Sequence, residues 1–386
     1  MEHATSFTPS QMVQRINAQS QRPARRPGAG IIKLNSGDPD FATPEYIRQA
    51  LIEAVQSGYT HYADNQGDPE LRAALAEQLS RQAGAAFAPE QILMTHGGSA
   101  AVTSSMLGAL NPGDRVLLPN PTYSLYADAA VMAGAEPVYV PQRPDFHLDL
   151  DALETAAAAP GTRMVVLCHP NNPTGIVYRP EELEALGRLA EQHDLLVLAD
   201  EAYENIVYDG VEFVSTVAIA SLRERLFYCQ TFSKTYAMTG WRLGYVAAPA
   251  PLTAAAARIH RTFTGPLNSA LQRAGLAAVT TPSTAPEEMC REYAARRELV
   301  NQLMGDVPGV SFTPPEGTFY TFFHYGADVP AQQVVADALE RGVAIRAGTE
   351  YGPAGKNYVR IAFSSSREDI TEGLMRLRAL LAGLDQ

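Results

Sequence analysis

The chain has 386 residues, of which 46% are hydrophobic and 19% are charged, which excludes wholesale disorder, a fibrous repeat and a small disulfide scaffold. The formal charge of -12 disfavours nucleic-acid binding, and no apolar run reaches the roughly 18 residues that a membrane helix needs. Three widely spaced cysteines and the lack of a signal-peptide pattern predict a cytoplasmic protein without a metal site.

The first residues are polar and contain the segment RPARRPGAG. They predict an irregular arm or a short helix followed by a linker, and we place the end of this arm at residue 35. Arg22, Arg25 and Arg26 are interpreted as a solvated patch of charge.

Short apolar runs alternate with helical stretches between about residues 90 and 250. Leu183, Leu186 and Leu189 recur at helical spacing between two of these runs. Such alternation is typical of a mostly parallel sheet that is covered by helices on both faces. The predicted strands are Ile92–Thr95, Val116–Leu118, Pro137–Val140, Met164–His169, Leu195–Ala199, Leu226–Gln230 and Leu243–Ala248.

The pattern changes from about residue 288. A helix containing REYAARRELVNQL precedes the strand-like FYTFFHY, a helix near 330–341, then VAIRAG, YVRIAFSSS and a last helix. This mixture predicts a smaller α+β domain over residues 288–386, joined by the arm at 1–35, beside a large domain over 36–287.

Polar segments follow four of the predicted strands. They are HGGSA after Ile92–Thr95, PNNPTG after Met164–His169, DEAY after Leu195–Ala199, and TFSKTYAMTGWRLGY after Leu226–Gln230. Because ligands bind beyond the carboxyl ends of parallel strands, we expect these segments to meet at one edge of the sheet.

The combined set of side chains matches pyridoxal 5′-phosphate. Lys234 supplies the primary amine that forms a Schiff base with the cofactor aldehyde. Asp200 supplies a carboxylate that stabilises the protonated pyridine nitrogen, and Tyr203 and Asn172 supply donors to the ring oxygen.

The phosphate of this cofactor needs a helix N-terminus and a cation. Thr231 and Ser233 both offer hydroxyl groups, and the sequence leaves open which of them binds the phosphate. The predicted phosphate site consists of the backbone N–H groups of Gly98, Ser99 and Ala100, the Arg242 guanidinium and one or both hydroxyls.

These motifs, with the late YVRIAFS, resemble the class I/II aminotransferases of fold type I, the aspartate aminotransferase superfamily, over about residues 31–380. The lysine signature is SKTYAMTGWRLGY, in which the phosphate arginine follows the lysine by eight residues. The resemblance implies a mostly parallel seven-stranded sheet between helices in the large domain.

The resemblance also implies four further roles. Gly37 lines the substrate carboxylate site, Tyr123 stacks on the pyridine ring, and Arg360 clamps the substrate α-carboxylate. Tyr62 reaches the phosphate of a neighbouring subunit, which implies a homodimer with shared active sites. Without the resemblance, Tyr62 would be interpreted as a loop residue packed in its own chain.

The implied activity is transfer of an amino group from an L-amino acid to a 2-oxo acid by a ping-pong mechanism through pyridoxamine phosphate. Lys234 takes the substrate Cα proton and returns it to the cofactor, and Asp200 and Tyr203 assist. The alternatives are a β-C–S lyase or decarboxylase on the same scaffold, and a cofactor-binding transcription regulator, for which the N-terminal segment is too short.

The sequence leaves the side-chain preference open. A dicarboxylic substrate needs a second cation, for which His260, Arg261 and His324 are the candidates. Tyrosine, phenylalanine and neutral side chains remain open as substrates.

Overall fold

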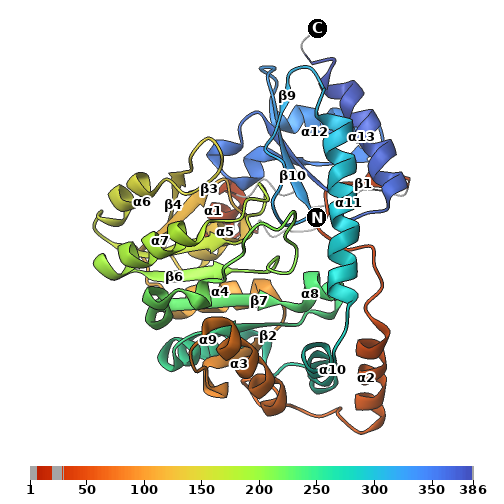
Figure 1. The fold of residues 1–386 in the computed structure, drawn as a ribbon. Helices are drawn as coiled ribbons and strands as arrows, with labels where there is room; N and C mark the ends of the chain where they lie inside the picture. The colour runs from red at the N-terminus through yellow and green to blue at the C-terminus, as the bar shows by residue number, and fades with distance from the viewer. Residues whose placement is uncertain (1–6, 20–27, 29, 385–386) are drawn as a thin grey trace, which may run out of the picture.

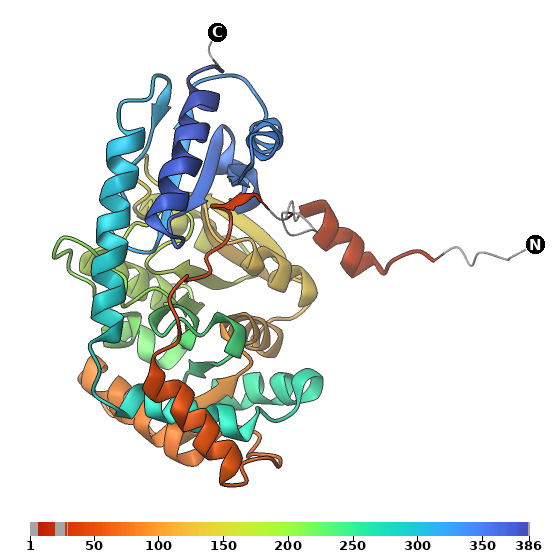
Figure 2. The same ribbon diagram turned by 90° about the vertical axis from the view of Figure 1, so that its right-hand side faces the viewer.

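A computed structural model describes residues 7–19, 28 and 30–384 of the chain. The predicted arginine patch at Arg22, Arg25 and Arg26 lies outside the described residues. The predicted short helix is present as α1 (Gln11–Gln19), which contacts α5 (Leu125–Met132) and extends away from the body of the molecule in Figure 2.

A seven-stranded sheet forms the centre of the molecule, in the order β2-β8-β7-β6-β5-β3-β4 (Figure 1). Only β8 runs antiparallel to its neighbours, so the fold class predicted from the sequence is confirmed. The strands are β2 (Ile92–Thr95), β3 (Arg115–Asn120), β4 (Glu136–Pro141), β5 (Thr162–Cys168), β6 (Leu196–Asp200), β7 (Leu226–Thr231) and β8 (Gly244–Ala247).

Both faces of this sheet are covered, because successive strand residues point to opposite faces and most of them are apolar. Val116 packs into one hydrophobic cluster and Leu117 into the other. One face is covered by α4 (Gly98–Ala109), α5 and α9 (Ala250–Thr264). The other is covered by α3 (Pro69–Ala83), α6 (Leu150–Ala157), α7 (Pro180–Gln192) and α10 (Ser269–Thr280), with α2 (Glu45–Gln56) packed on α10.

A second, antiparallel sheet follows later in the chain. Its strand order is β12-β13-β10-β9, and the short β1 (Ile32–Lys33) pairs separately with β11 (Val343–Ala344). The strands are β9 (Val310–Ser311), β10 (Tyr320–Tyr325), β12 (Arg346–Ala347) and β13 (Tyr358–Ala362), and the helices are α11 (Ala285–Met304), α12 (Ala331–Glu340) and α13 (Arg367–Leu381). The predicted boundary at 287/288 falls inside α11, and the division into domains stays a prediction.

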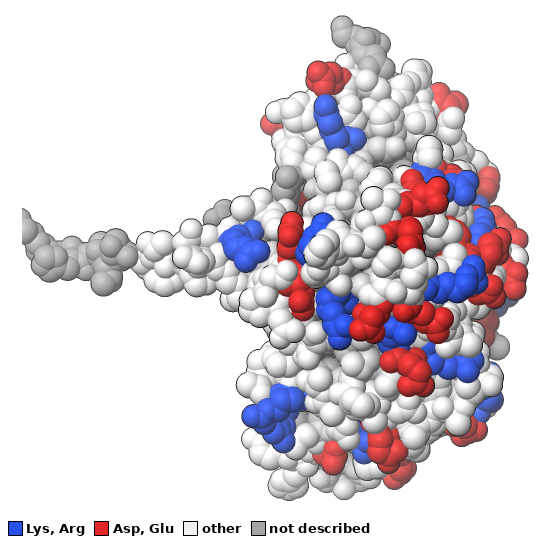
Figure 3. Space-filling model, turned by 90° about the vertical axis from the view of Figure 1, so that its left-hand side faces the viewer, with Lys and Arg blue, Asp and Glu red and all other residues white. Residues whose placement is uncertain are grey.

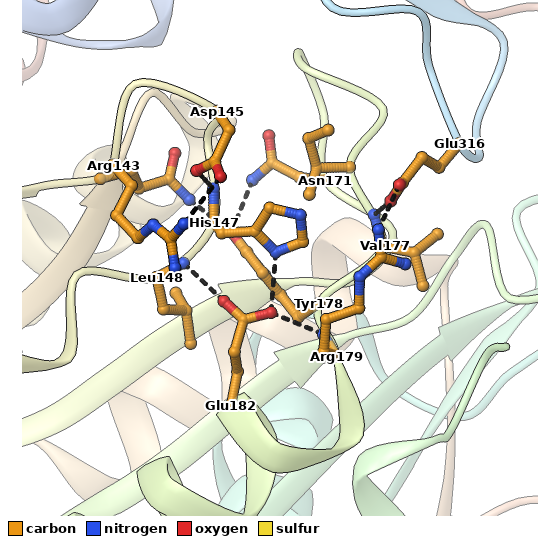
Figure 4. Close-up of polar contacts among 12 residues, drawn as sticks. Arg143, Asp145, His147, Leu148, Asn171, Val177, Tyr178, Arg179, Glu182 and Glu316 are labelled. Atoms are coloured by element: carbon orange, nitrogen blue, oxygen red, sulfur yellow. Dashed lines mark hydrogen bonds and ion pairs between the residues drawn. The ribbon is translucent and has the colours of Figure 1, made fainter. Parts of the chain in front are cut away.

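The two sheets are joined by contacts around Glu316, which lies just before β10 (Figure 4). Its carboxylate pairs with Arg179 and accepts from the Val177 N–H at 3.1 Å. The N–H groups of Glu316 and Gly317 donate to the Gly175 carbonyl at 2.9 and 2.8 Å. These contacts fix the segment after β5 against the second sheet.

Acidic and basic side chains are interspersed over the face that Figure 3 presents. Within residues 7–19, 28 and 30–384, no helix is both long and apolar enough to cross a bilayer. The predicted compartment stays a prediction.

Candidate functional site

A cavity of about 690 Å³ opens at the carboxyl ends of the parallel strands. It is bordered by the second sheet and by the segment that contains Asn35–Asp38. Of the residues predicted for the site, the cavity lining contains Gly37, Gly98, Ser99, Tyr123, Asn172, Asp200, Tyr203, Thr231, Ser233, Lys234, Arg242 and Arg360.

Lys234 lies in α8 (Phe232–Thr235), the short helix that follows β7. Its Nζ donates to the Gly37 carbonyl at 2.5 Å and lies 5.7 Å from the centroid of the Phe319 ring. Burial lowers the pKa of Lys234 to about 8, and the nearby charges of Arg242 and Arg360 act in the same direction. A lysine that gives up its proton this readily is suited to nucleophilic and acid–base chemistry.

Asp200 is the last residue of β6, and its side chain is buried. Its Oδ2 accepts from the Tyr126 hydroxyl at 2.9 Å, and its Oδ1 accepts from the Ala202 N–H at 3.3 Å. Burial raises the pKa of Asp200, which the hydrogen bond from Tyr126 and the charge of Lys234 oppose. The carboxylate is therefore held by two hydrogen bonds and forms no ion pair with any described residue, and a cationic ligand group would stabilise it.

Another part of the cavity lining combines a helix N-terminus with Arg242. Helix α4 begins at Gly98, directly after Gly97 in a left-handed conformation (φ 79°). A Cβ atom at Gly97 would lie 2.6 Å from the Arg242 Nη2, so only glycine allows the guanidinium to approach the start of this helix. Backbone N–H groups and a guanidinium that converge in this way form an anion-binding site.

The two hydroxyl groups of TFSK have different bonding. Thr231 caps α8, and its Oγ1 accepts from the Ser233 N–H at 3.2 Å while lying 3.1 Å from the Leu243 carbonyl. The Ser233 hydroxyl lies 2.9 Å from the Thr231 Oγ1 and also lines the cavity. The Thr231 hydroxyl is thus used by the backbone groups of Ser233 and Leu243, and the Ser233 hydroxyl is more available to a ligand.

Arg360 lies on β13 and is buried at the border of the two sheets. Its Nη1 donates to the Asn172 Oδ1 at 3.0 Å and its Nη2 to the Asn35 carbonyl at 2.9 Å. The guanidinium carbon lies 4.0 Å from the centroid of the Tyr320 ring. The Arg360 Nε is buried and lacks a partner among the described residues, as expected of a site that awaits an anionic ligand.

The aromatic side chains enclose the cavity. The Tyr203 and Tyr320 hydroxyls lie 3.1 Å apart, and the Tyr123 ring meets Tyr126 edge-on with centroids 5.8 Å apart. A Cβ atom at Gly37 would come within 1.8 Å of the Tyr320 hydroxyl oxygen. Glycine at this position is therefore required by close packing.

Two residues predicted for the site lie outside the cavity lining. Ala100 is in the first turn of α4, and its N–H donates to the Gly97 carbonyl at 3.2 Å. Tyr62 lies on the surface with 92% of its side chain exposed. Their predicted roles stay predictions.

The cations suggested for a second carboxylate are also absent from this lining. His260 is buried against His96, with Nε2 and Nδ1 3.2 Å apart, while His324 is on β10 and Arg261 is exposed on α9. Tyr126, Tyr320, Arg346 and Glu350 are among the lining residues with polar groups that the sequence interpretation missed.

Comparison with known proteins identifies the family. Residues 29–377 match the family described as aminotransferase class I and II. The chain is 37% identical to the aromatic-amino-acid aminotransferase 2 of Thermococcus litoralis (91% of this chain, 92% of the relative) and 34% identical to the aspartate aminotransferase of Pyrococcus horikoshii (92% and 91%).

Solved structures of aminotransferases also superpose on this chain. The aromatic aminotransferase of Pyrococcus horikoshii superposes with a TM-score of 0.89 at 32% identity, covering 96% of this chain and 98% of the other. The aspartate aminotransferase of Thermus thermophilus, solved with maleate, gives 0.86 at 34% identity, covering 97% of each. The chain is therefore a member of the class I and II aminotransferases, a family that depends on pyridoxal phosphate and transfers amino groups.

Proposed function

We propose that the amino-group transfer takes place in the cavity around Lys234, with pyridoxal 5′-phosphate as cofactor and with an L-amino acid and a 2-oxo acid as substrates. The observation that carries this proposal is the placement of three groups in one cavity: the Lys234 amine, the Asp200 carboxylate and the cradle of Gly97, α4 and Arg242. This donor set fits an aldehyde, a basic ring nitrogen and a phosphate.

The residues have distinct tasks in holding the cofactor. Asp200, fixed by Tyr126, balances the charge of a protonated ring nitrogen. The phosphate would be bound by Arg242, Ser233 and the Gly98 and Ser99 N–H groups, with Thr231 as a positioning residue. Because the Asn172 Oδ1 accepts from Arg360, its Nδ2 is left to donate, with the Tyr203 hydroxyl, to the ring oxygen. Tyr123 would pack against the ring.

The cofactor, when bound, supplies an aldehyde that captures the substrate amine and a ring that accepts electrons from Cα. The Arg360 guanidinium and the Gly37 backbone bind the substrate α-carboxylate and so orient the Cα–H bond. The Lys234 amine takes the Cα proton, since a pKa lowered to about 8 leaves more of it neutral near pH 7 than an ordinary lysine would have.

We also propose a homodimer in which Tyr62 serves the partner's site. Tyr62 is exposed, and its loop lies against α10, where the Ser269 hydroxyl is 2.9 and 3.0 Å from the Tyr59 and His61 carbonyl oxygens and can donate to either. The exposed apolar side chains of Ile52 and Val55 are on α2, which packs on the helix that carries Ser269. A second copy of the chain is the occupant we propose for this surface.

The low lysine content makes the test specific. The chain contains only Lys33, Lys234 and Lys356, and the first and last are exposed. Borohydride reduction of the holoenzyme followed by peptide mass spectrometry should place the cofactor on Lys234. Lys234→Ala should abolish both this label and the absorbance change on adding an amino donor, whereas Lys356→Ala should retain both.

A label on Lys33 or Lys356 alone would contradict the assignment. Dependence on an added 2-oxo acid for sustained turnover separates an aminotransferase from a lyase or decarboxylase on the same scaffold. Turnover that continues without an acceptor would favour those alternatives.

A further inference from the structure

The cavity contains one cation more than the proposed function uses. Its lining includes Lys234, Arg242, Arg346 and Arg360. The cofactor aldehyde, the phosphate and the substrate α-carboxylate account for Lys234, Arg242 and Arg360. Arg346 is left for the substrate side chain.

Arg346 stands directly beside Arg360. Strands β12 and β13 pair antiparallel with Arg346 opposite Arg360, so both side chains point to the same face of the second sheet. Both guanidinium groups also donate to one acceptor, the Asn35 carbonyl, from Arg346 Nε at 3.2 Å and from Arg360 Nη2 at 2.9 Å.

Two like charges at this separation are destabilising unless a counter-charge lies close by. Glu350, buried on the turn Gly348–Tyr351, provides it, because its Oε2 accepts from the Arg346 Nη1 at 2.8 Å. Arg346 thus uses its Nε and Nη1 for protein oxygens. Its Nη2 has no protein acceptor within the described part of the chain, and the side chain retains 25% exposure.

We propose that Arg346 is a second carboxylate-binding residue of the substrate pocket, and that Glu350 sets how strongly it attracts a dicarboxylic substrate. This inference rests on the proposed function and defines its substrate class. A dicarboxylic amino acid or 2-oxo acid places one carboxylate on Arg360 and the other on Arg346.

The pairing of Arg346 with Glu350 is also compatible with an uncharged substrate side chain. While Arg346 is paired with Glu350, the pair is neutral overall, and an aromatic or aliphatic side chain meets no isolated charge. A second carboxylate competes with Glu350 for the guanidinium, so the preference for dicarboxylates is moderated rather than absolute. Both substrate classes are therefore expected to react at one site.

The test measures ligand binding to the holoenzyme by calorimetry. Maleate and succinate serve as unreactive dicarboxylates, and 3-phenylpropionate serves as a monocarboxylate of similar reach. The variants are Arg346→Met, which removes the charge and keeps the length, and Glu350→Gln, which removes the counter-charge and keeps the shape. Arg341→Met, at an exposed position outside the cavity lining, is the control.

Arg346→Met should weaken the binding of maleate and succinate at least tenfold and alter 3-phenylpropionate binding less than twofold. Glu350→Gln should tighten dicarboxylate binding several-fold, which also tests the proposal if Arg346→Met fails to fold. Arg341→Met should match the wild type for all three ligands.

Equal losses for both ligand classes would assign Arg346 to the α-carboxylate and overturn the proposal. The proposal would also be overturned if both variants had unchanged affinities. It would be overturned too if the wild-type protein bound 3-phenylpropionate but not the dicarboxylates. These outcomes are distinct from failure of the proposed function, in which no amino donor changes the absorbance of the wild-type holoenzyme.

Discussion

Thr231 and Ser233 lie two residues apart and have the same functional group, yet their hydrogen bonds differ. The Thr231 hydroxyl accepts from the first turn of α8, and the Ser233 hydroxyl is the one we propose to bind the cofactor phosphate. A hydrogen bond to a charged acceptor contributes roughly 1.5–3 kcal/mol.

Ser233→Ala should therefore weaken cofactor binding about ten- to a hundredfold, measured by titrating the apoprotein with cofactor. Thr231→Val should instead lower the unfolding free energy of the apoprotein by roughly 0.5–2 kcal/mol, the usual cost of losing an N-cap. A larger loss of cofactor affinity in Thr231→Val than in Ser233→Ala would reverse the assignment.

At the scale of elements, the N-terminus of α7 depends on one buried carboxylate (Figure 4). Glu182 accepts from the Leu148 N–H at 2.8 Å, from the Arg179 N–H at 2.6 Å and from His147 Nδ1 at 2.8 Å. Glu182 thereby connects the helix to the segment before α6.

Glu182→Ala should destabilise the protein by roughly 1–3 kcal/mol for each buried amide left unpaired. Glu182→Gln should cost less, because it keeps an acceptor, and Glu184→Ala, exposed on the same helix, should be nearly neutral. Urea unfolding of the apoprotein measures all three. Equal stability of Glu182→Ala and Glu184→Ala would contradict this account.

The contact between His147 and Glu182 predicts that the stability of the protein depends on pH. The hydrogen bond to Glu182 raises the pKa of His147 above its usual 6.5. Burial alone would raise the pKa of Glu182, but hydrogen bonds from His147 and two amides lower it. A raised histidine pKa stabilises the fold fully below pH 6.5, and the effect is lost as pH rises through the raised value. The stability gap between wild type and His147→Ala should thus be larger at pH 6 than at pH 9.

At the scale of the whole molecule, shared active sites predict recovery of activity by subunit mixing. Lys234→Ala chains lack the amine, and Tyr62→Ala chains lack the hydroxyl proposed to reach the partner's phosphate. In a mixed dimer, one site has both the lysine of one chain and the tyrosine of the other.

At limiting cofactor, a mixture of the two variants should therefore regain part of the wild-type activity after subunit exchange. Light scattering establishes the dimer, and differential tagging establishes the exchange. A fully active monomer would refute the proposal that the subunits share active sites. Exchanged dimers that recover no activity would refute it as well.

The parts of the site that could be predicted lie directly after apolar strands. Lys234 follows β7, Asp200 ends β6 and Asn172 follows β5, and the geometry of parallel sheets brings such positions together whatever their separation in the chain. Most predicted strands agree with the structure to within two residues. The two-residue β9 was missed, because so short a segment carries no periodic signal.

Other parts depend on contacts that no local pattern encodes. Tyr126 reaches Asp200 from the middle of an apolar stretch, where it resembles any core tyrosine. Arg346 could have been found only by aligning VAIRAG against YVRIAF as antiparallel strands, because this pairing places it opposite Arg360. Without the pairing, nothing in the sequence distinguishes Arg346 from the other arginines.

The reversed direction of β8 has a consequence for the order of folding. Lys234 and Arg242 both lie in the segment 232–243 that joins β7 to β8, so the lysine and the arginine proposed to bind the phosphate come together through contacts that are local in sequence. Arg360 meets Asn172 and Asn35 only after loops of 188 and 325 residues close. Local contacts form early and distant ones late. A nascent or refolding chain is thus expected to bring Lys234 and Arg242 together before Arg360 reaches Asn172 and Asn35.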